Sequence, residues 1–167
     1  MDIIERILAT LLAEFSDLGQ VEHLTRAVLR LFLAVVLGGL LGYEREVMGK
    51  AAGVRTHMLV CLGATIFVMA LEQEGAGHDA MSRVIQGVAA GIGFLCAGTI
   101  LKGQSISDVK GLTTAAGLWS AAAIGVAVGL GREATAVLGT LIALLVLHVM
   151  PLLVDPTNTG RHDKKDD

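Results

Sequence analysis

Charge is scarce in this sequence, and the scarcity is uneven. Of the 167 residues, 17% are charged and 53% are hydrophobic, whereas an ordinary soluble domain carries roughly a quarter charged residues. The acidic and basic residues between Val84 and Val154 are Lys102, Asp108, Lys110, Arg132 and Glu133. The long uncharged stretches between them cannot form a solvated surface, so the composition excludes a water-soluble domain.

Clustered basic residues, cysteine frameworks and histidine motifs are lacking as well. The net charge of −3 and the dispersed basic residues argue against a nucleic-acid partner. Cys61 and Cys96 each lie inside an apolar run, so a disulfide framework is not expected. The five histidines are scattered, and none has the spacing of a metal-binding helix or of a nucleophile with its base. The sequence therefore predicts no enzyme, no catalytic residue and no cofactor.

Apolar residues recur at helical spacing along most of the chain and divide it into three parts. We expect an amphipathic helix over residues 1–22, a transmembrane domain over 23–154 and a polar cytoplasmic tail over 155–167. The amphipathic helix either lies in the membrane interface or packs on the bundle as a surface helix.

The transmembrane domain divides into about five apolar segments. A helix that crosses a hydrocarbon core of ~30 Å needs about 20 residues, and the first two charge-free stretches are short, so those helices span only if basic side chains snorkel or the bilayer thins. The expected fold is all-α, a polytopic membrane helical bundle. Its segments lie near residues 26–43, 57–72, 84–101, 112–131 and 134–154.

Lysine and arginine are unequally divided between the two sides that these segments define. By the positive-inside rule, the richer side faces the cytoplasm. This predicts an N-terminus outside and a cytoplasmic C-terminus. The eight basic residues of the cytoplasmic side are Arg45, Lys50, Arg55, Lys102, Lys110, Arg161, Lys164 and Lys165, and the five of the other side are Arg6, Arg26, Arg30, Arg83 and Arg132.

Two of these arginines, Arg26 and Arg30, lie one helical turn apart on one face of the first segment. If that face points into the bundle, they form a cationic site for an anionic lipid or a carboxylate. If it points outward, they snorkel to the interface.

Glycine is abundant, with 21 residues, most of them inside the apolar segments. Helices in lipid associate by close packing, and small residues at four-residue spacing let two backbones approach. Such spacing predicts a tightly packed bundle. The glycines assigned to helix packing are Gly38, Gly42, Gly87, Gly91, Gly117, Gly125 and Gly129.

Polar residues gather in two segments on the predicted cytoplasmic side. In each, a glycine-rich helix is followed by a short loop, and a basic residue with threonine opens the next helix. Such a helix start favours an anion or a partner carboxylate, while two carboxylates suit a hydrated Mg²⁺, for which Glu44 and Glu46 are the candidates. Alternatively, the basic residues only fix orientation and pair with the glutamates. The candidate cluster comprises Glu44, Arg45, Glu46, Arg55, Thr56, Lys102, Asp108, Lys110, Thr113 and Thr114.

Four blocks of sequence, at residues 39–46, 52–60, 91–100 and 109–116, resemble the MgtC/SapB family in order and spacing, over about residues 30–130. The resemblance implies a bacterial inner-membrane protein, linked in some members to growth in low magnesium and to survival inside phagocytes. Longer members continue into a soluble domain, which we expect this short form to lack. Cys96 stands where the family usually has glycine, and a small thiol still permits close packing.

The resemblance and the residues together leave three functions open. The first is a non-enzymatic regulator or interaction protein in low-magnesium or stress adaptation. The second is a transporter or channel for Mg²⁺ or another cation, and the third is a structural subunit that docks another membrane complex such as ATP synthase. The expected partners are membrane lipids, a second copy of the chain in a homo-oligomer and a membrane protein, with Mg²⁺ as a ligand or a signal.

Overall fold

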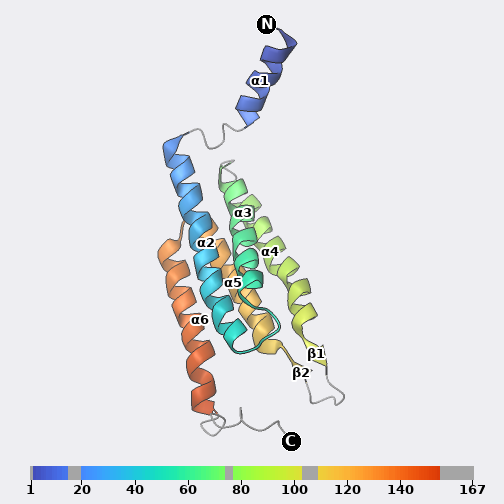
Figure 1. The fold of residues 1–167 in the computed structure, drawn as a ribbon, viewed down its shortest axis with the longest axis vertical. Helices are drawn as coiled ribbons and strands as arrows, with labels where there is room; N and C mark the ends of the chain where they lie inside the picture. Colours follow the sequence, from blue (N-terminus) through green and yellow to red (C-terminus); the bar gives the residue numbers. More distant parts are fainter. Residues whose placement is uncertain (1, 15–19, 74–76, 103–108, 155–167) are drawn as a thin grey trace, which may run out of the picture.

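Long helices run side by side and alternate in direction in the computed structural model, which describes residues 2–14, 20–73, 77–102 and 109–154 (Figure 1). Two two-residue strands pair antiparallel at the lower end of the bundle, with Leu101 opposite Lys110. The predicted all-α bundle is confirmed, with this short ladder as an addition. The elements are α1 (Ile3–Glu14), α2 (Val21–Val47), α3 (Val54–Gln73), α4 (His78–Thr99), β1 (Leu101–Lys102), β2 (Val109–Lys110), α5 (Leu112–Gly129) and α6 (Glu133–Val154).

Four of the described helices, α2 to α5, are long and apolar enough to cross a membrane, and α6 is apolar over Glu133–Val149. The first two helices extend beyond the predicted apolar segments. Helix α2 has 27 residues and α3 has 20. Both continue through charged residues, and Arg30, Arg45 and Glu72 among these form ion pairs. The predicted tail, 155–167, lies outside the described residues.

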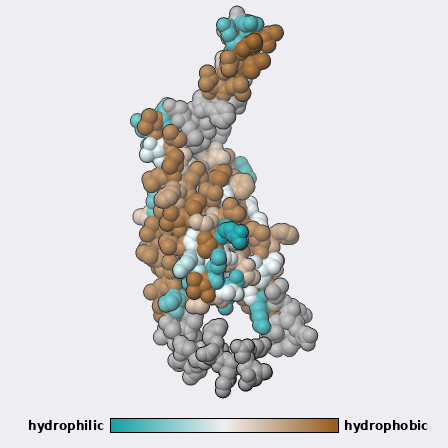
Figure 2. Space-filling model, in the orientation of Figure 1, coloured by the Kyte–Doolittle hydropathy of each residue, from teal (hydrophilic) through white to brown (hydrophobic). Residues whose placement is uncertain are grey.

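The outer surface of the bundle is apolar, as a membrane requires. Large hydrophobic side chains point outward along the helices; Phe32 is 66% exposed and Phe94 is 84% exposed. Figure 2 shows hydrophobic residues over most of the visible bundle. This arrangement is unfavourable in water and favourable in lipid, so the helices form a multi-pass membrane domain.

Helix α1 extends beyond the upper end of the bundle (Figure 1). Its apolar residues Ile3, Ile7 and Leu12 are all more than half exposed. In the structure this helix therefore does not pack on the bundle as a surface helix. An unpacked amphipathic helix next to a membrane domain is suited to the interface.

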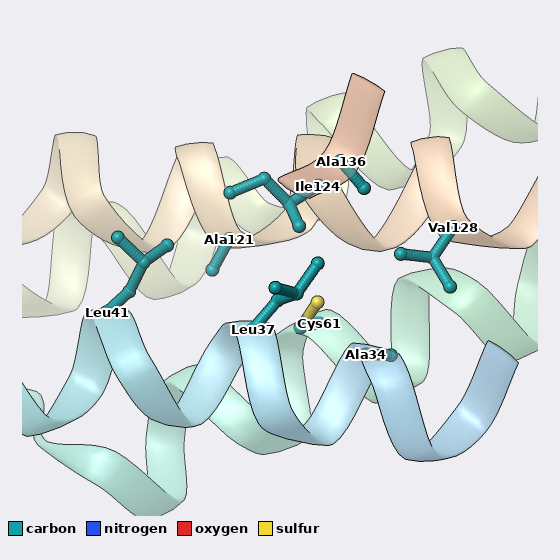
Figure 3. Packing of buried hydrophobic residues seen from close by; sticks show 8 residues of the cluster. All are labelled: Ala34, Leu37, Leu41, Cys61, Ala121, Ile124, Val128 and Ala136. Atoms are coloured by element: carbon teal, nitrogen blue, oxygen red, sulfur yellow. The ribbon is translucent and has the colours of Figure 1, made fainter. Parts of the chain in front are cut away.

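The core is built from small and medium side chains between four helices. Figure 3 shows α2 and α5 facing each other, with Leu37 of α2 directed toward Ile124 of α5. The hydroxyl of Thr65 on α3 shares its one proton between two carbonyl oxygens, that of Cys61 (2.9 Å) and that of Gly125 on α5 (2.8 Å). The buried cluster comprises Ala34, Leu37, Leu41, Cys61, Ala121, Ile124, Val128 and Ala136.

Glycines allow α3 to lie close against two neighbours. A Cβ added to Gly38 of α2 would lie 2.7 Å from the carbonyl oxygen of His57, and one on Gly42 would lie 2.6 Å from the Cα of Val54. On the α5 side, Gly125 would place a Cβ 2.2 Å from the carbonyl oxygen of Cys61. The partners are backbone atoms, which cannot rotate away. Two further packing candidates also make close contacts with α3: Gly117 and Gly129.

Two glycines assigned to helix packing do not have this role in the described chain. A Cβ on Gly87 or Gly91 of α4 would meet nothing within 4 Å, and both residues are exposed. Four-residue spacing describes one helix face, whereas close packing also needs a neighbour at that face. The described residues of this chain provide no such neighbour for Gly87 and Gly91, so their role in helix packing stays a prediction.

We expect Gly125→Ala to destabilise the bundle by about 1–3 kcal/mol, because the added methyl group must displace the backbone of α3. The matched control is Gly139→Ala in α6, whose Cβ would meet only a side-chain atom of Ile124 at 4.0 Å. The measurement is the free energy of unfolding in mixed detergent micelles. Equal stability of the two variants would contradict the close contact.

Candidate functional site at the α2–α3 turn

The turn between α2 and α3 is fixed by a carboxylate. Glu46, near the end of α2, accepts a hydrogen bond from the backbone N–H of Val54 at 2.8 Å, where α3 begins. A Cβ on Gly53 would lie against the same carboxylate oxygen, so glycine leaves room for the carboxylate in its present position. A carboxylate at a helix N-terminus satisfies a free N–H group and interacts favourably with the helix dipole. Glu46 therefore acts as a cap.

Beside this cap, Arg45 and Glu44 form a buried ion pair. The side chain of Arg45 is 4% exposed and that of Glu44 is 12% exposed. The Nη2 of Arg45 lies 2.5 Å from the Oε1 of Glu44, and its Nε contacts the Oε2, so the pairing is bidentate. A buried guanidinium that lacked such a partner would carry a large desolvation cost.

His57, one turn into α3, is fully buried where α2, α3 and α5 meet. Its Nδ1 lies 3.0 Å from the carbonyl oxygen of Gly53, and because a carbonyl only accepts, Nδ1 donates. In the neutral ring Nε2 is then an acceptor, and it has no partner among the described residues. This nitrogen would lie 3.3 Å from a Cβ on Gly117.

His57 is not among the predicted site residues, because the five histidines are scattered along the sequence. A usable signal was present: His57 lies in the same polar block as Arg55 and Thr56, immediately before an apolar run. A polar residue in the first turn of a membrane helix can be buried in the bundle, as His57 is.

The predicted cluster is only partly brought together. Glu46 binds the start of α3, and Glu44 and Arg45 pair beside it. Arg55 is exposed and Thr56 is half-buried on α3. In the second segment Lys110 and Thr113 are exposed and Thr114 is buried. Asp108 and the side chain of Lys102 lie outside the described residues. Both segments lie at the lower end of the bundle (Figure 1).

The two carboxylates proposed for Mg²⁺ already have protein partners. Glu44 binds Arg45, and Glu46 binds the N–H of Val54. Within the ranges that the structure describes, no group of three or more His, Cys, Asp or Glu side chains gathers in a way that would hold a metal. Glu44 pairs with a basic residue, as the alternative expected, whereas Glu46 binds a backbone N–H group instead.

The second turn, between α4 and α5, depends on Gly111. Its φ of +92° is in the left-handed region, and a Cβ would lie 1.9 Å from the carbonyl oxygen of Thr99. Nearby, the thiol of Cys96 donates to the carbonyl oxygen of Ala115 at 3.2 Å. Cys96 is thus accommodated at the contact of α4 with α5.

A second charged cluster, at the upper end, joins four helices. Arg30 of α2 forms an ion pair with Glu72 of α3, and its Nε lies 3.6 Å from an oxygen of Glu133 on α6. Its Nη1 also donates to the carbonyl oxygen of Gly129, the last residue of α5, at 3.0 Å. The arginine therefore points inward to carboxylates, whereas Arg26 is exposed. The sequence contained a usable indication of this cluster, because Arg30, Glu72 and Glu133 all lie near the predicted outer side of the membrane.

We expect Arg45→Ala to cost about 3 kcal/mol, because Glu44 would be left buried without a partner. Replacing both residues, as Glu44→Gln with Arg45→Met, should cost less than the single change. Lys50→Ala, which removes an exposed charge in the same turn, is the control. The free energy of unfolding in detergent distinguishes them, and a double variant less stable than Arg45→Ala would contradict the buried pair.

The sequence is similar to those of several known proteins. The sequence profile of the MgtC family matches residues 31–155. SrpB of Synechococcus elongatus is 43% identical over 129 residues, 71% of each chain. "Putative magnesium transporter YhiD" of Escherichia coli is 38% identical over 130 residues, 73% of this chain and 59% of that protein.

A third relative, MgtC of Salmonella typhimurium, is 41% identical over 117 residues, 70% of this chain and 49% of that protein. The chain thus spans about half of MgtC and somewhat more of YhiD. No solved structure matches.

Proposed function

This multi-pass membrane protein belongs to the MgtC family, and we propose that it is a non-enzymatic regulator or interaction protein of the bacterial inner membrane that acts in magnesium-limited or stress physiology. The names of two relatives, MgtC and "Putative magnesium transporter YhiD", connect the family to magnesium. Four carboxylates of the bundle are bound to protein groups, and this favours regulation over transport.

That use of charge is the observation that carries the proposal. Glu44 and Glu46 are engaged at the α2–α3 turn, and Glu72 and Glu133 are engaged by Arg30 at the other end. Cation pathways and proton relays commonly use ionisable groups inside the membrane. In the part of the chain that the structure describes, Glu46, Glu72 and Glu133 join one helix to another. Glu44 instead neutralises Arg45 on its own helix. A closely packed cluster of apolar side chains lies between the two ends.

The lower end of the bundle is the face that we assign to the cytoplasm. Exposed basic residues lie there, among them Lys50 at the α2–α3 turn. The predicted orientation, with the N-terminus outside, follows from the positive-inside rule. A partner membrane protein, or a second copy of this chain, would meet the exposed charges at this end.

We expect deletion of the gene to slow growth in low magnesium and under acid stress, and the wild-type gene to restore it. Lys50→Glu should restore growth poorly while accumulating normally, because it reverses a charge on the proposed contact face. Arg83→Glu, which reverses an exposed charge of α4, should restore it fully. Unchanged growth of the deletion strain across magnesium levels and acid stress would refute the proposal.

Cation transport is the second candidate, and the printed name of YhiD favours it. Purified protein in liposomes separates the two functions. Regulation predicts no flux of Mg²⁺, K⁺ or H⁺ above that of empty liposomes. A flux that Glu44→Gln lowers and Glu22→Gln leaves unchanged would favour transport instead.

Docking to another membrane complex, the third candidate, is tested by photo-crosslinking from position 50 in intact cells. A crosslink to another membrane protein would identify the partner. Crosslinks between copies of this chain alone would indicate a homo-oligomer.

A further inference from the structure

An apolar groove lies between α3 and α4, and the function proposed above does not use it. Its volume is about 780 Å³. Leu59 and Phe67 of α3 line it and are 67% and 65% exposed, so it is accessible from outside the bundle. Gly87 and Gly91 line its other wall, and Ala122 of α5 also lines it.

The groove exists because α4 does not pack closely against α3. The glycines along it, Gly63, Gly87 and Gly91, would each accept a Cβ without any atom within 4 Å. On α4 the structure buries only Ile92 among the residues described. The small residues thus leave space instead of bringing two backbones into contact.

The length of the groove matches one leaflet of a bilayer. Along α3 its lining runs from Arg55 to Phe67, a rise of about 18 Å at 1.5 Å per residue. One leaflet of hydrocarbon is about 15 Å deep, half of the ~30 Å core. An acyl chain that follows α3 would therefore fill the groove from the lower interface to about the bilayer centre.

The charge at the lower end of the groove selects the headgroup. Arg55, an exposed residue at the start of α3, is the charged residue that lines the groove, and Thr56 beside it supplies a hydroxyl. An arginine binds a phosphate through planar, paired hydrogen bonds, and a basic residue near the membrane surface favours anionic lipid.

We propose that this groove binds one anionic phospholipid of the leaflet at the lower end, with an acyl chain along Gly63, Gly87 and Gly91 and the phosphate at Arg55. The site uses Arg55 at the start of α3 and none of the three charged residues Glu44, Arg45 and Glu46, and it does not depend on the regulatory function.

Native mass spectrometry of the full chain, released from micelles with equal phosphatidylglycerol and phosphatidylcholine, tests the proposal. The wild type should retain one phosphatidylglycerol. Arg55→Gln should lower the preference for it about fivefold, while Arg83→Gln should not. Gly91→Leu should remove the retained lipid, because its side chain fills the groove. Gly93→Leu, on the same helix with equal space but outside the groove lining, should keep it.

Each remaining outcome counts against the proposal. Equal retention by the Gly91→Leu and Gly93→Leu variants would overturn it, and Gly87→Leu provides a second groove variant if the first does not fold. Loss of a dimer in Gly91→Leu, without loss of lipid, would show that a second copy occupies the groove. Displacement of the lipid by millimolar inorganic phosphate would indicate a simple anion site at Arg55.

Discussion

The close approach of α3 to α2 and α5 is the constraint on which the rest of the bundle depends. In lipid no hydrophobic force drives helices together, so their association relies on packing and on hydrogen bonds between them. Gly38 and Gly42 place the α2 backbone against one side of α3, and Gly125 does the same from α5. The hydroxyl of Thr65 then reaches the carbonyl oxygen of Gly125. A side chain at position 125 would push the two backbones apart and prevent this contact.

The two charged clusters follow from this packing. Once α2 is held against α3 and α5, Arg45 has no route to water and binds the neighbouring Glu44, and Arg30 reaches Glu72 on α3. Each arginine lies near one end of the bundle, where long polar side chains are least costly in a membrane. Fixed pairs at both ends explain why α2 and α3 continue as helices through residues that a hydropathy reading treats as boundaries.

Helix α4 packs less closely than its neighbours although it has a similar spacing of glycines. It is rich in glycine, yet Gly87 and Gly91 face open space. It contacts α5 more extensively than α3, and the thiol of Cys96 donates to the carbonyl oxygen of Ala115 on α5. The same residue type therefore produces a tight helix contact on α2 and a lipid-sized groove on α4. The difference lies in the position of the neighbouring helix.

The sequence by itself determined the all-α class, the apolar spans and the family, because hydropathy, helical period and short motifs are local properties of the chain. It also identified the turn that carries Glu44 and Glu46. It could not show that Glu46 caps α3 or that His57 is buried, and it did not connect Arg30 to Glu72. Only the tertiary structure decided these contacts, because each partner lies on another helix or beyond a turn, and its position depends on how closely the backbones pack.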